Sequence, residues 1–161
     1  MLLIKAKNEK RRKIEYQTGV NEMGLVFAEI ELTSVDDLVL HRRGFLEKDK
    51  IKTVKVKSLV DTGSFMLAIN DEIRNQLDLP LLEKQFSVLA DETQIEVEVV
   101  GPIEVRFENR RTTCDAVVIP HSRDVLLGAI PMEDMDVLID PRQQKLVVNP
   151  KHPYVATKYL K

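Results

Sequence analysis

The stretch Leu59-Val60-Asp61-Thr62-Gly63-Ser64 is the most informative part of this sequence. It places a carboxylate, a hydroxyl and a glycine directly after an apolar run. Residues 51–60 alternate Val, Ile and Thr with lysine, which predicts a β-strand. We therefore expect Asp61 at the point where a strand ends over the core and the chain turns sharply. An Asp-Thr-Gly tripeptide also occurs in ordinary turns, so a purely structural carboxylate is the alternative.

Short strands with regular turn signals dominate the sequence. Apolar and polar residues alternate over 25–32, with Val26, Ala28, Ile30 and Leu32 on one face. Two apolar runs flank the polar residues 91–94, which is typical of a hairpin, and Gly101-Pro102 is predicted to end it. The strands expected in all cover residues 25–32, 51–60, 86–90, 95–100, 103–107, 114–119 and 145–149. This pattern indicates an all-β barrel or sandwich.

Two segments carry helix signals. Asn70 is a good N-cap for a helix that Pro80 bounds, and acidic residues follow it in the first turn. Residues 131–135 read as one helical turn with Pro131 at its first position. The charged stretch 41–50, which contains Gly44, is expected to form an exposed hairpin loop.

Composition bounds the class of protein. At 161 residues, with 43% hydrophobic and 31% charged residues, the chain suits one globular domain. The net charge of −2 gives no reason to expect nucleic acid or an anionic membrane as a partner. No apolar run has the length of a membrane span.

Cys114 is the only cysteine, which excludes an internal disulfide and favours a reducing, cytoplasmic location. It lies in the run Thr113-Cys114-Asp115-Ala116-Val117 with no accompanying His/Asn context, which indicates a buried strand residue rather than a nucleophile. Six basic residues against one acid fall in residues 5–13. We expect residues 1–22 to form a basic N-terminal extension, solvated or disordered, and residues 23–161 to form the folded domain.

The order of these elements resembles the retropepsin-like (clan AA) aspartic proteases, in their bacterial or archaeal single-domain form. The resemblance rests on Asp61-Thr62-Gly63-Ser64 after a strand, a following helix and hairpin, and Leu126-Leu127-Gly128 downstream. It implies an all-β fold, a closed β-barrel with one or two short helices. Because Asp-Thr-Gly occurs once, it also implies a two-fold symmetric homodimer with one Asp61 from each subunit at the axis.

The resemblance assigns a role to each motif residue. Asp61 is the catalytic residue. Thr62 bonds across the dimer axis, Gly63 lets the backbone approach closely, and Ser64 hydrogen-bonds Asp61. Leu126, Leu127 and Gly128 form a structural element beneath the catalytic loop.

The hairpin around residues 86–99 takes the place of the family's flap, which covers an extended substrate. Its tip is expected at Ala90, Asp91, Glu92 and Thr93. The glycine-rich tip of retroviral proteases is absent from this sequence.

The chemistry implied is hydrolysis of a peptide bond by water that two carboxylates activate. One ionised carboxylate takes a proton from the water while the other, protonated, donates to the carbonyl oxygen. Two close carboxylates do not both ionise readily, so the pair titrates as a unit. No cofactor and no metal are expected, since His41, His121 and His152 show no metal-ligand spacing.

Two other functions remain open. The chain is alternatively a non-catalytic dimer with the same fold that binds peptides or partner proteins by strand addition. The unusual flap tip and the charged 41–50 segment motivate that interpretation. A third possibility is one domain of a larger assembly, with the basic extension recruiting a partner.

Overall fold

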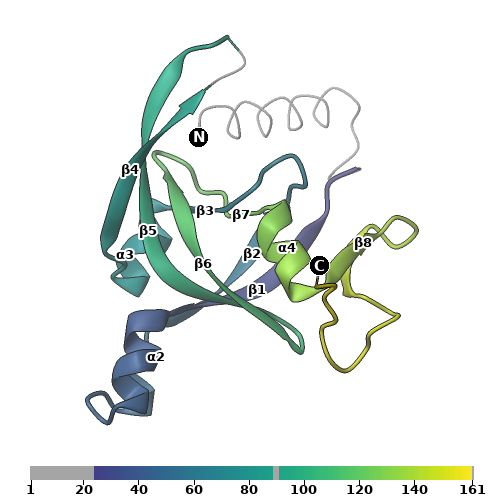
Figure 1. Cartoon of the computed structure of the whole chain (residues 1–161). Helices are drawn as coiled ribbons and strands as arrows, with labels where there is room; N and C mark the ends of the chain where they lie inside the picture. Colours follow the sequence, from purple (N-terminus) through teal and green to yellow (C-terminus); the bar gives the residue numbers. More distant parts are fainter. Residues whose placement is uncertain (1–23, 89–90, 161) are drawn as a thin grey trace.

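The described part of the chain folds into a mostly β structure with three short α-helices (Figure 1). The structure is a computed structural model and describes residues 24–88 and 91–160. The mostly β prediction is confirmed. The basic extension predicted over residues 1–22 lies outside the described residues.

Seven strands form the main sheet, in the order β1-β2-β7-β3-β6-β5-β4. The first strand, β1, also pairs with β5, so the hydrogen-bonded order returns to its beginning and leaves β4 outside this ring. Two further strands, β8 and β9, pair separately. The bounds are β1 (Phe27–Ser34), β2 (Thr53–Val60), β3 (Leu67–Asn70), β4 (Leu81–Val88), β5 (Gln94–Phe107), β6 (Arg110–Ile119), β7 (Leu126–Leu127), β8 (Val137–Asp140) and β9 (Lys145–Val148).

The alternation read from the sequence of β1 is confirmed. Ala28, Ile30 and Leu32 are 6%, 1% and 0% exposed, because successive side chains of a strand face opposite sides. They pack in the main core with residues from the other strands and helices. The largest fully buried side chains are Ile30, Leu32, Leu67, Ile69, Leu77, Ile103, Ile119, Leu126, Leu127 and Met135.

Residues 24–88 and 91–160 contain three α-helices where one or two were predicted: α2 (Val35–Arg42), α3 (Asp71–Leu77) and α4 (Ala129–Met135). The stretch 41–50, predicted as an exposed hairpin loop, does lie in the largely exposed connection between the antiparallel strands β1 and β2, but it is not a simple loop. This stretch contains the end of α2 and a short 3-10 helix, η1 (Lys48–Lys50). The Ser34 hydroxyl caps α2 by accepting from the Asp37 amide at 3.3 Å. That cap was the sequence signal for the missed helix, since serine and an acid three residues later often begin one.

Three other predictions need correction. The strands predicted on either side of Gly101-Pro102 are one strand, β5, whose register with β6 shifts between Val100 and Ile103. Helix α4 begins at Ala129, which puts Pro131 third rather than first. Strands β3, β7 and β8 were not predicted, because runs of two to four residues are too short to show a strand period.

Among the described residues, no helix is both long and apolar enough to span a bilayer.

We predict that Asn70→Ala lowers the free energy of unfolding by about 2 kcal/mol. Asn70 is 5% exposed and uses both ends of its amide. Its oxygen accepts from the Ile73 amide at 2.9 Å and caps α3, while its nitrogen donates to the Arg123 carbonyl at 3.0 Å. Urea denaturation measures the change. Asn70→Ser keeps a capping oxygen and should lose less, and an Ala variant as stable as the parent would contradict the prediction.

Candidate active site

Asp61 lies where β2 ends, in the position expected from the sequence. The last residues of β2 run parallel to β7, pairing Leu59 with Leu126 and Val60 with Leu127. The Asp61 amide donates to the Leu127 carbonyl at 2.9 Å and extends this ladder by one bond. The carboxylate is therefore held by the sheet itself, and Asp61 is 1% exposed.

The next three residues form a tight turn around the carboxylate. The Ser64 amide donates to the Asp61 carbonyl at 3.0 Å, and the Gly63 amide donates to Asp61 Oδ1 at 3.0 Å. An amide that donates to a carboxylate fixes its rotamer. Thr62 and Gly63 are exposed, whereas Ser64 is buried and its hydroxyl donates to the Met66 carbonyl at 3.4 Å.

Gly128 packs directly against this turn. A β-carbon built on Gly128 would lie 2.3 Å from the Met66 carbonyl oxygen and 2.7 Å from that of Ser64. Both contacts are with backbone, which has little room to move. A glycine at this position is what lets the segment after β7 approach the turn after β2.

The start of α4 fastens the same turn. The Ala129 amide donates to the Ser64 carbonyl at 2.8 Å, and the Ile130 amide donates to the Phe65 carbonyl at 3.0 Å. The first amides of a helix have no partner within the helix, so the turn satisfies them. Residues 61–66 and 126–130 therefore form one interlocked unit; we call it the Asp61 turn.

Two large apolar side chains on the Asp61 turn face solvent. Phe65 is 75% exposed and Ile130 is 51% exposed. The hydrogen bond between their backbones brings these residues together from segments distant in the sequence. Apolar side chains beside a buried carboxylate form a surface suited to being covered by another chain.

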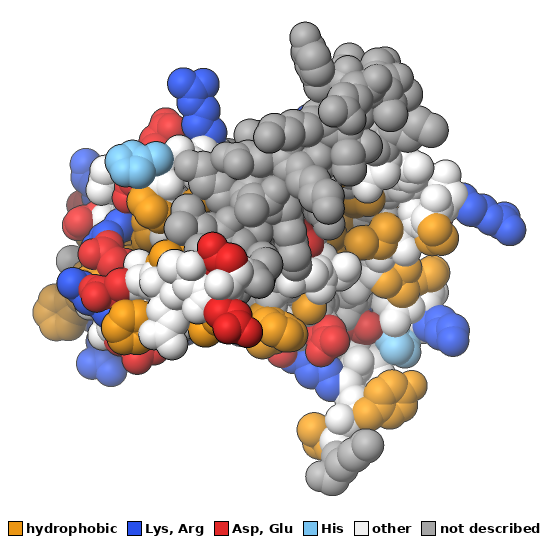
Figure 2. Space-filling view, turned by 90° about the horizontal axis from the view of Figure 1, so that it is seen from above, with side chains coloured by type: hydrophobic (Ala, Val, Ile, Leu, Met, Phe, Trp, Pro, Cys, Tyr) orange, Lys and Arg blue, Asp and Glu red, His pale blue; other side chains and the backbone are white. Residues whose placement is uncertain are grey.

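The expected flap is the β4–β5 hairpin, which in Figure 1 rises on the same side of the molecule as the loop joining β2 to β3. Ala90 lies outside the described residues, while Asp91, Glu92 and Thr93 are exposed. The Thr93 hydroxyl and amide both bond the Asp91 carboxylate and hold its pKa below the usual value. In Figure 2, which looks down on this side, charged side chains of both signs are mixed.

Cys114 lies in β6 and is half-buried. Burial raises the pKa of its thiol to about 12, with a smaller contribution from Asp115. The thiol therefore stays protonated at neutral pH, which agrees with a structural residue and not with a nucleophile.

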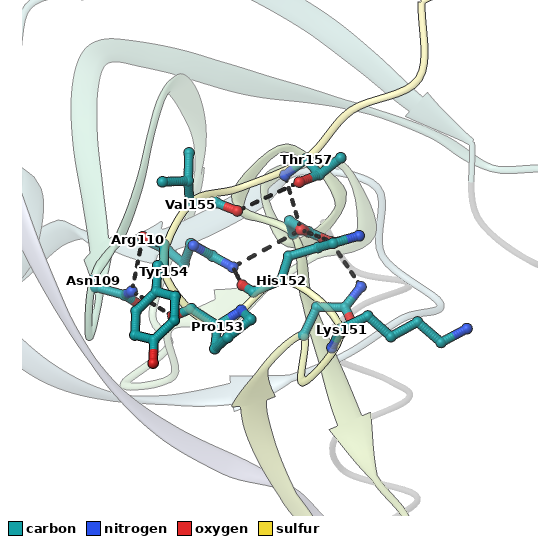
Figure 3. Close-up of polar contacts among 10 residues, drawn as sticks. Asn109, Arg110, Lys151, His152, Pro153, Tyr154, Val155 and Thr157 are labelled. Atoms are coloured by element: carbon teal, nitrogen blue, oxygen red, sulfur yellow. Dashed lines mark hydrogen bonds and ion pairs between the residues drawn. The ribbon is translucent and has the colours of Figure 1, made fainter.

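A second polar cluster, which the sequence analysis missed, centres on Asp136 (Figure 3). Asp136 Oδ2 accepts from the Thr157 amide at 3.0 Å and lies 2.7 Å from His152 Nδ1. Asn149 donates to Oδ1 at 3.0 Å. Together, the Thr157 amide and the amide of Asn149 lower the pKa of the Asp136 carboxyl to about 2, and His152 adds to the effect.

Arg110, whose side chain is buried, also belongs to this cluster. Its side chain is 1% exposed, its Nη2 donates to the His152 carbonyl, and the same nitrogen lies 3.9 Å from Asp136 Oδ2. Asn109 donates to the Pro153 carbonyl at 3.0 Å. The cluster therefore fastens the C-terminal segment, residues 150–158, to the β5–β6 turn and to the end of α4. These contacts have a structural role. Nothing in the sequence around residue 136 or residue 152 predicted them.

The structure brings Asp61, Thr62, Gly63 and Ser64 together with Leu126, Leu127 and Gly128, and it puts Asp91–Thr93 at the end of the hairpin. The histidines lie apart: His41 Nδ1 is 2.9 Å from the Leu46 carbonyl, and His152 contacts Asp136. Within residues 24–88 and 91–160, no group of three His, Cys, Asp or Glu side chains is placed to hold a metal ion.

Comparisons with known proteins add little to this geometry. No protein-family model and no curated protein matches the sequence. Among solved structures, the chain is similar to the retroviral protease-like domain of Ddi1 from Leishmania major, with a TM-score of 0.47 and 14% sequence identity over 78% of this chain and 90% of that chain. A likeness at this level carries no argument about the site, so the assignment of Asp61 rests on the contacts described above.

We predict that Gly128→Ala lowers the free energy of unfolding by about 3 kcal/mol or more, because the new methyl group meets fixed backbone on two sides. Gly44→Ala is the matched control. Gly44 has open space around it but a φ of +81°, so replacing it by alanine should lower the free energy of unfolding by only about 1 kcal/mol. Both changes are measured by urea denaturation, and equal losses would show that the contact with the Asp61 turn is not tight.

The Asp136 cluster predicts a stability that depends on pH. The pKa of Asp136 is about 2 in the folded chain against an ordinary 3.8, so its stabilisation is present above about pH 4 and is lost as pH falls through 2. Asp136→Asn should therefore be less stable than the parent at neutral pH, and the difference should shrink in acid. Urea titrations of both proteins across this range measure it, with Asp78→Asn at the exposed end of α3 as the control. A difference independent of pH would contradict the assignment.

Proposed function

We propose that this chain is an aspartic endopeptidase that works as a homodimer, with a water molecule activated by two Asp61 carboxylates, one from each subunit. The observation that carries the proposal is the geometry of the Asp61 turn. A buried carboxylate is held at a strand end by the sheet, by the Gly63 amide and by the α4 amides, which is the rigid placement that acid–base catalysis needs.

The exposed parts of the Asp61 turn support a dimer. Thr62 and Gly63 face solvent although they adjoin a residue that is 1% exposed. Phe65 and Ile130 add apolar surface next to them. A second copy meeting this surface on a two-fold axis would cover these side chains and bring the two carboxylates together.

The mechanism follows from the pairing of like charges. Two carboxylates that share a site hold one proton between them. The ionised partner takes a proton from water, and the protonated partner donates to the carbonyl oxygen of the scissile bond. The Gly63 amide, 3.0 Å from Asp61 Oδ1, would hold each carboxylate in a fixed orientation for this proton transfer.

The arrangement of strands is compatible with this reading. Pairing of β1 with both β2 and β5 supports a closed barrel, and the β4–β5 hairpin is available as a flap over an extended peptide. The single cysteine supports placing the activity in the cytoplasm.

A non-catalytic dimer that binds peptides is the second candidate, and one observation favours it. Strand β4 is the outer strand of the main sheet, and seven of its eight residues are exposed, among them Leu81, Leu82, Phe86 and Val88. A long apolar edge of this kind accepts an added strand. This candidate predicts peptide binding that does not require Asp61.

We predict that Asp61→Asn reduces hydrolysis of an unstructured protein such as casein by roughly a thousandfold. Asparagine keeps an oxygen for the Gly63 amide, so the fold and the association should survive, as checked by circular dichroism and sedimentation velocity. Asp78→Asn is the control, because Asp78 has a φ of +48° at the end of α3, where asparagine fits as well. Equal turnover by the parent and the Asp61 variant would remove the assignment.

Mixing the two proteins tests the shared site. If one carboxylate comes from each subunit, a heterodimer with a single Asp61 is inactive, so excess Asp61→Asn protein should suppress the activity of a fixed amount of parent. An excess of the Asp78→Asn protein should not. Peptide binding that persists in the Asp61 variant, with no cleavage by the parent at any pH, would favour the non-catalytic candidate.

A further inference from the structure

The connection from β1 to β2 is an independent protrusion at the end of the sheet opposite the hairpin β4–β5 (Figure 1). Its base is closed by the Ser34 amide, which donates to the Lys52 carbonyl at 3.1 Å. Above the base, the buried Asp37 carboxylate accepts from the Lys52 amide and pairs with the Lys52 ammonium, each at 2.9 Å. These contacts hold the base of the protrusion, and α2 also lies against β5.

The outer part of this protrusion, residues 40–50, presents an aromatic side chain on a fixed backbone; we call it the α2–η1 tip. Phe45 is 77% exposed, yet its amide donates to the Leu40 carbonyl at 2.9 Å. Gly44 and His41 also bond within the tip. An exposed ring on a rigid backbone loses little conformational freedom when it is covered, which is a property of binding hot spots.

Basic side chains surround this ring in the sequence. Arg42, Arg43, Lys48 and Lys50 are exposed, and none of them has an ion pair with any residue in the described part of the chain. Elsewhere, the arginines of β5 and β6 and the lysine of β4 each pair with a carboxylate. The tip therefore carries four exposed cationic side chains that form no ion pair with the described residues.

We propose that the α2–η1 tip is a docking surface for an acidic segment of another protein, one that places an apolar side chain against Phe45 and carboxylates against Arg42 and Arg43. Arginine and aromatic residues are enriched at the centres of protein interfaces. A guanidinium also pairs with a carboxylate through two parallel hydrogen bonds, which gives such contacts direction.

The composition of the tip favours a peptide over a lipid surface. Glu47 and Asp49 stand among the four basic residues, so the tip as a whole has only a modest positive charge. An anionic bilayer attracts the sum of these charges and repels the two acids. A peptide instead places its carboxylates opposite individual arginines and avoids the acids.

The test uses the full chain and a fluorescent synthetic peptide in which a Leu-Phe pair is flanked by glutamates. Fluorescence anisotropy should show binding that weakens as salt is added. Arg42→Glu/Arg43→Glu should weaken it by about tenfold or more, and Phe45→Ser should weaken it comparably. A peptide with glutamine in place of glutamate should bind poorly to the parent.

The matched control is Arg142→Glu/Lys145→Glu, which makes the same charge change at the exposed β8–β9 turn. It should bind the peptide as the parent does. Circular dichroism confirms that each variant is folded. Equal binding by both double variants, no binding by the parent, or binding of phosphatidylserine vesicles in place of the peptide would each overturn the proposal.

Discussion

The close approach of Gly128 to the turn after Asp61 is the constraint on which the site depends. Residues 61–66 and 126–130 are far apart in the sequence, and each supplies what the other lacks. The turn offers carbonyls, and the start of α4 offers amides that have no partner within the helix. The exchange needs the two backbones in contact. A β-carbon on Gly128 would lie 2.3 Å from the Met66 carbonyl oxygen, so only a hydrogen atom fits between them. The carboxylate is placed by this interlock before any substrate or partner is present.

In this site the carboxylate is held rigidly inside the fold, while the residues next to it stay accessible. The Asp61 backbone continues the β2–β7 ladder and Oδ1 of its carboxylate accepts the Gly63 amide, which together offset part of the cost of burying this residue. Its immediate neighbours Thr62 and Gly63 remain exposed, so the ordered turn ends at a surface that a second chain can reach. The same surface carries the exposed apolar side chains of Phe65 and Ile130, which the proposed second copy would cover.

The sequence predicted the parts that depend on local rules. The period-two pattern of β1, the Asn70 cap of α3 and the turn at Asp61 each follow from neighbouring residues, and the structure has all of them. Helix α2 was not predicted, although Ser34 is a good N-cap for it, because its valines and its charged end are not typical of a helix. Gly128 contacts Met66, and polar side chains contact Asp136, only in the folded chain. These contacts join segments that are distant in the sequence, so no local pattern predicts them. The association of two copies at Asp61 depends on surface residues. Surface residues follow no hydrophobic period of the kind that identifies core residues in a sequence.

Strand β2 connects the two surfaces that stand out on this molecule. The α2–η1 tip precedes its first residue, Thr53, and Asp61 follows its last, Val60. Eight residues of strand span about 26 Å, so a segment bound at the tip leaves the Asp61 turn open. The base of the protrusion is closed by its own hydrogen bonds, and β2 is held along its length by β1. Occupation of the tip therefore need not disturb the carboxylate, and a long flexible protein would be able to contact both.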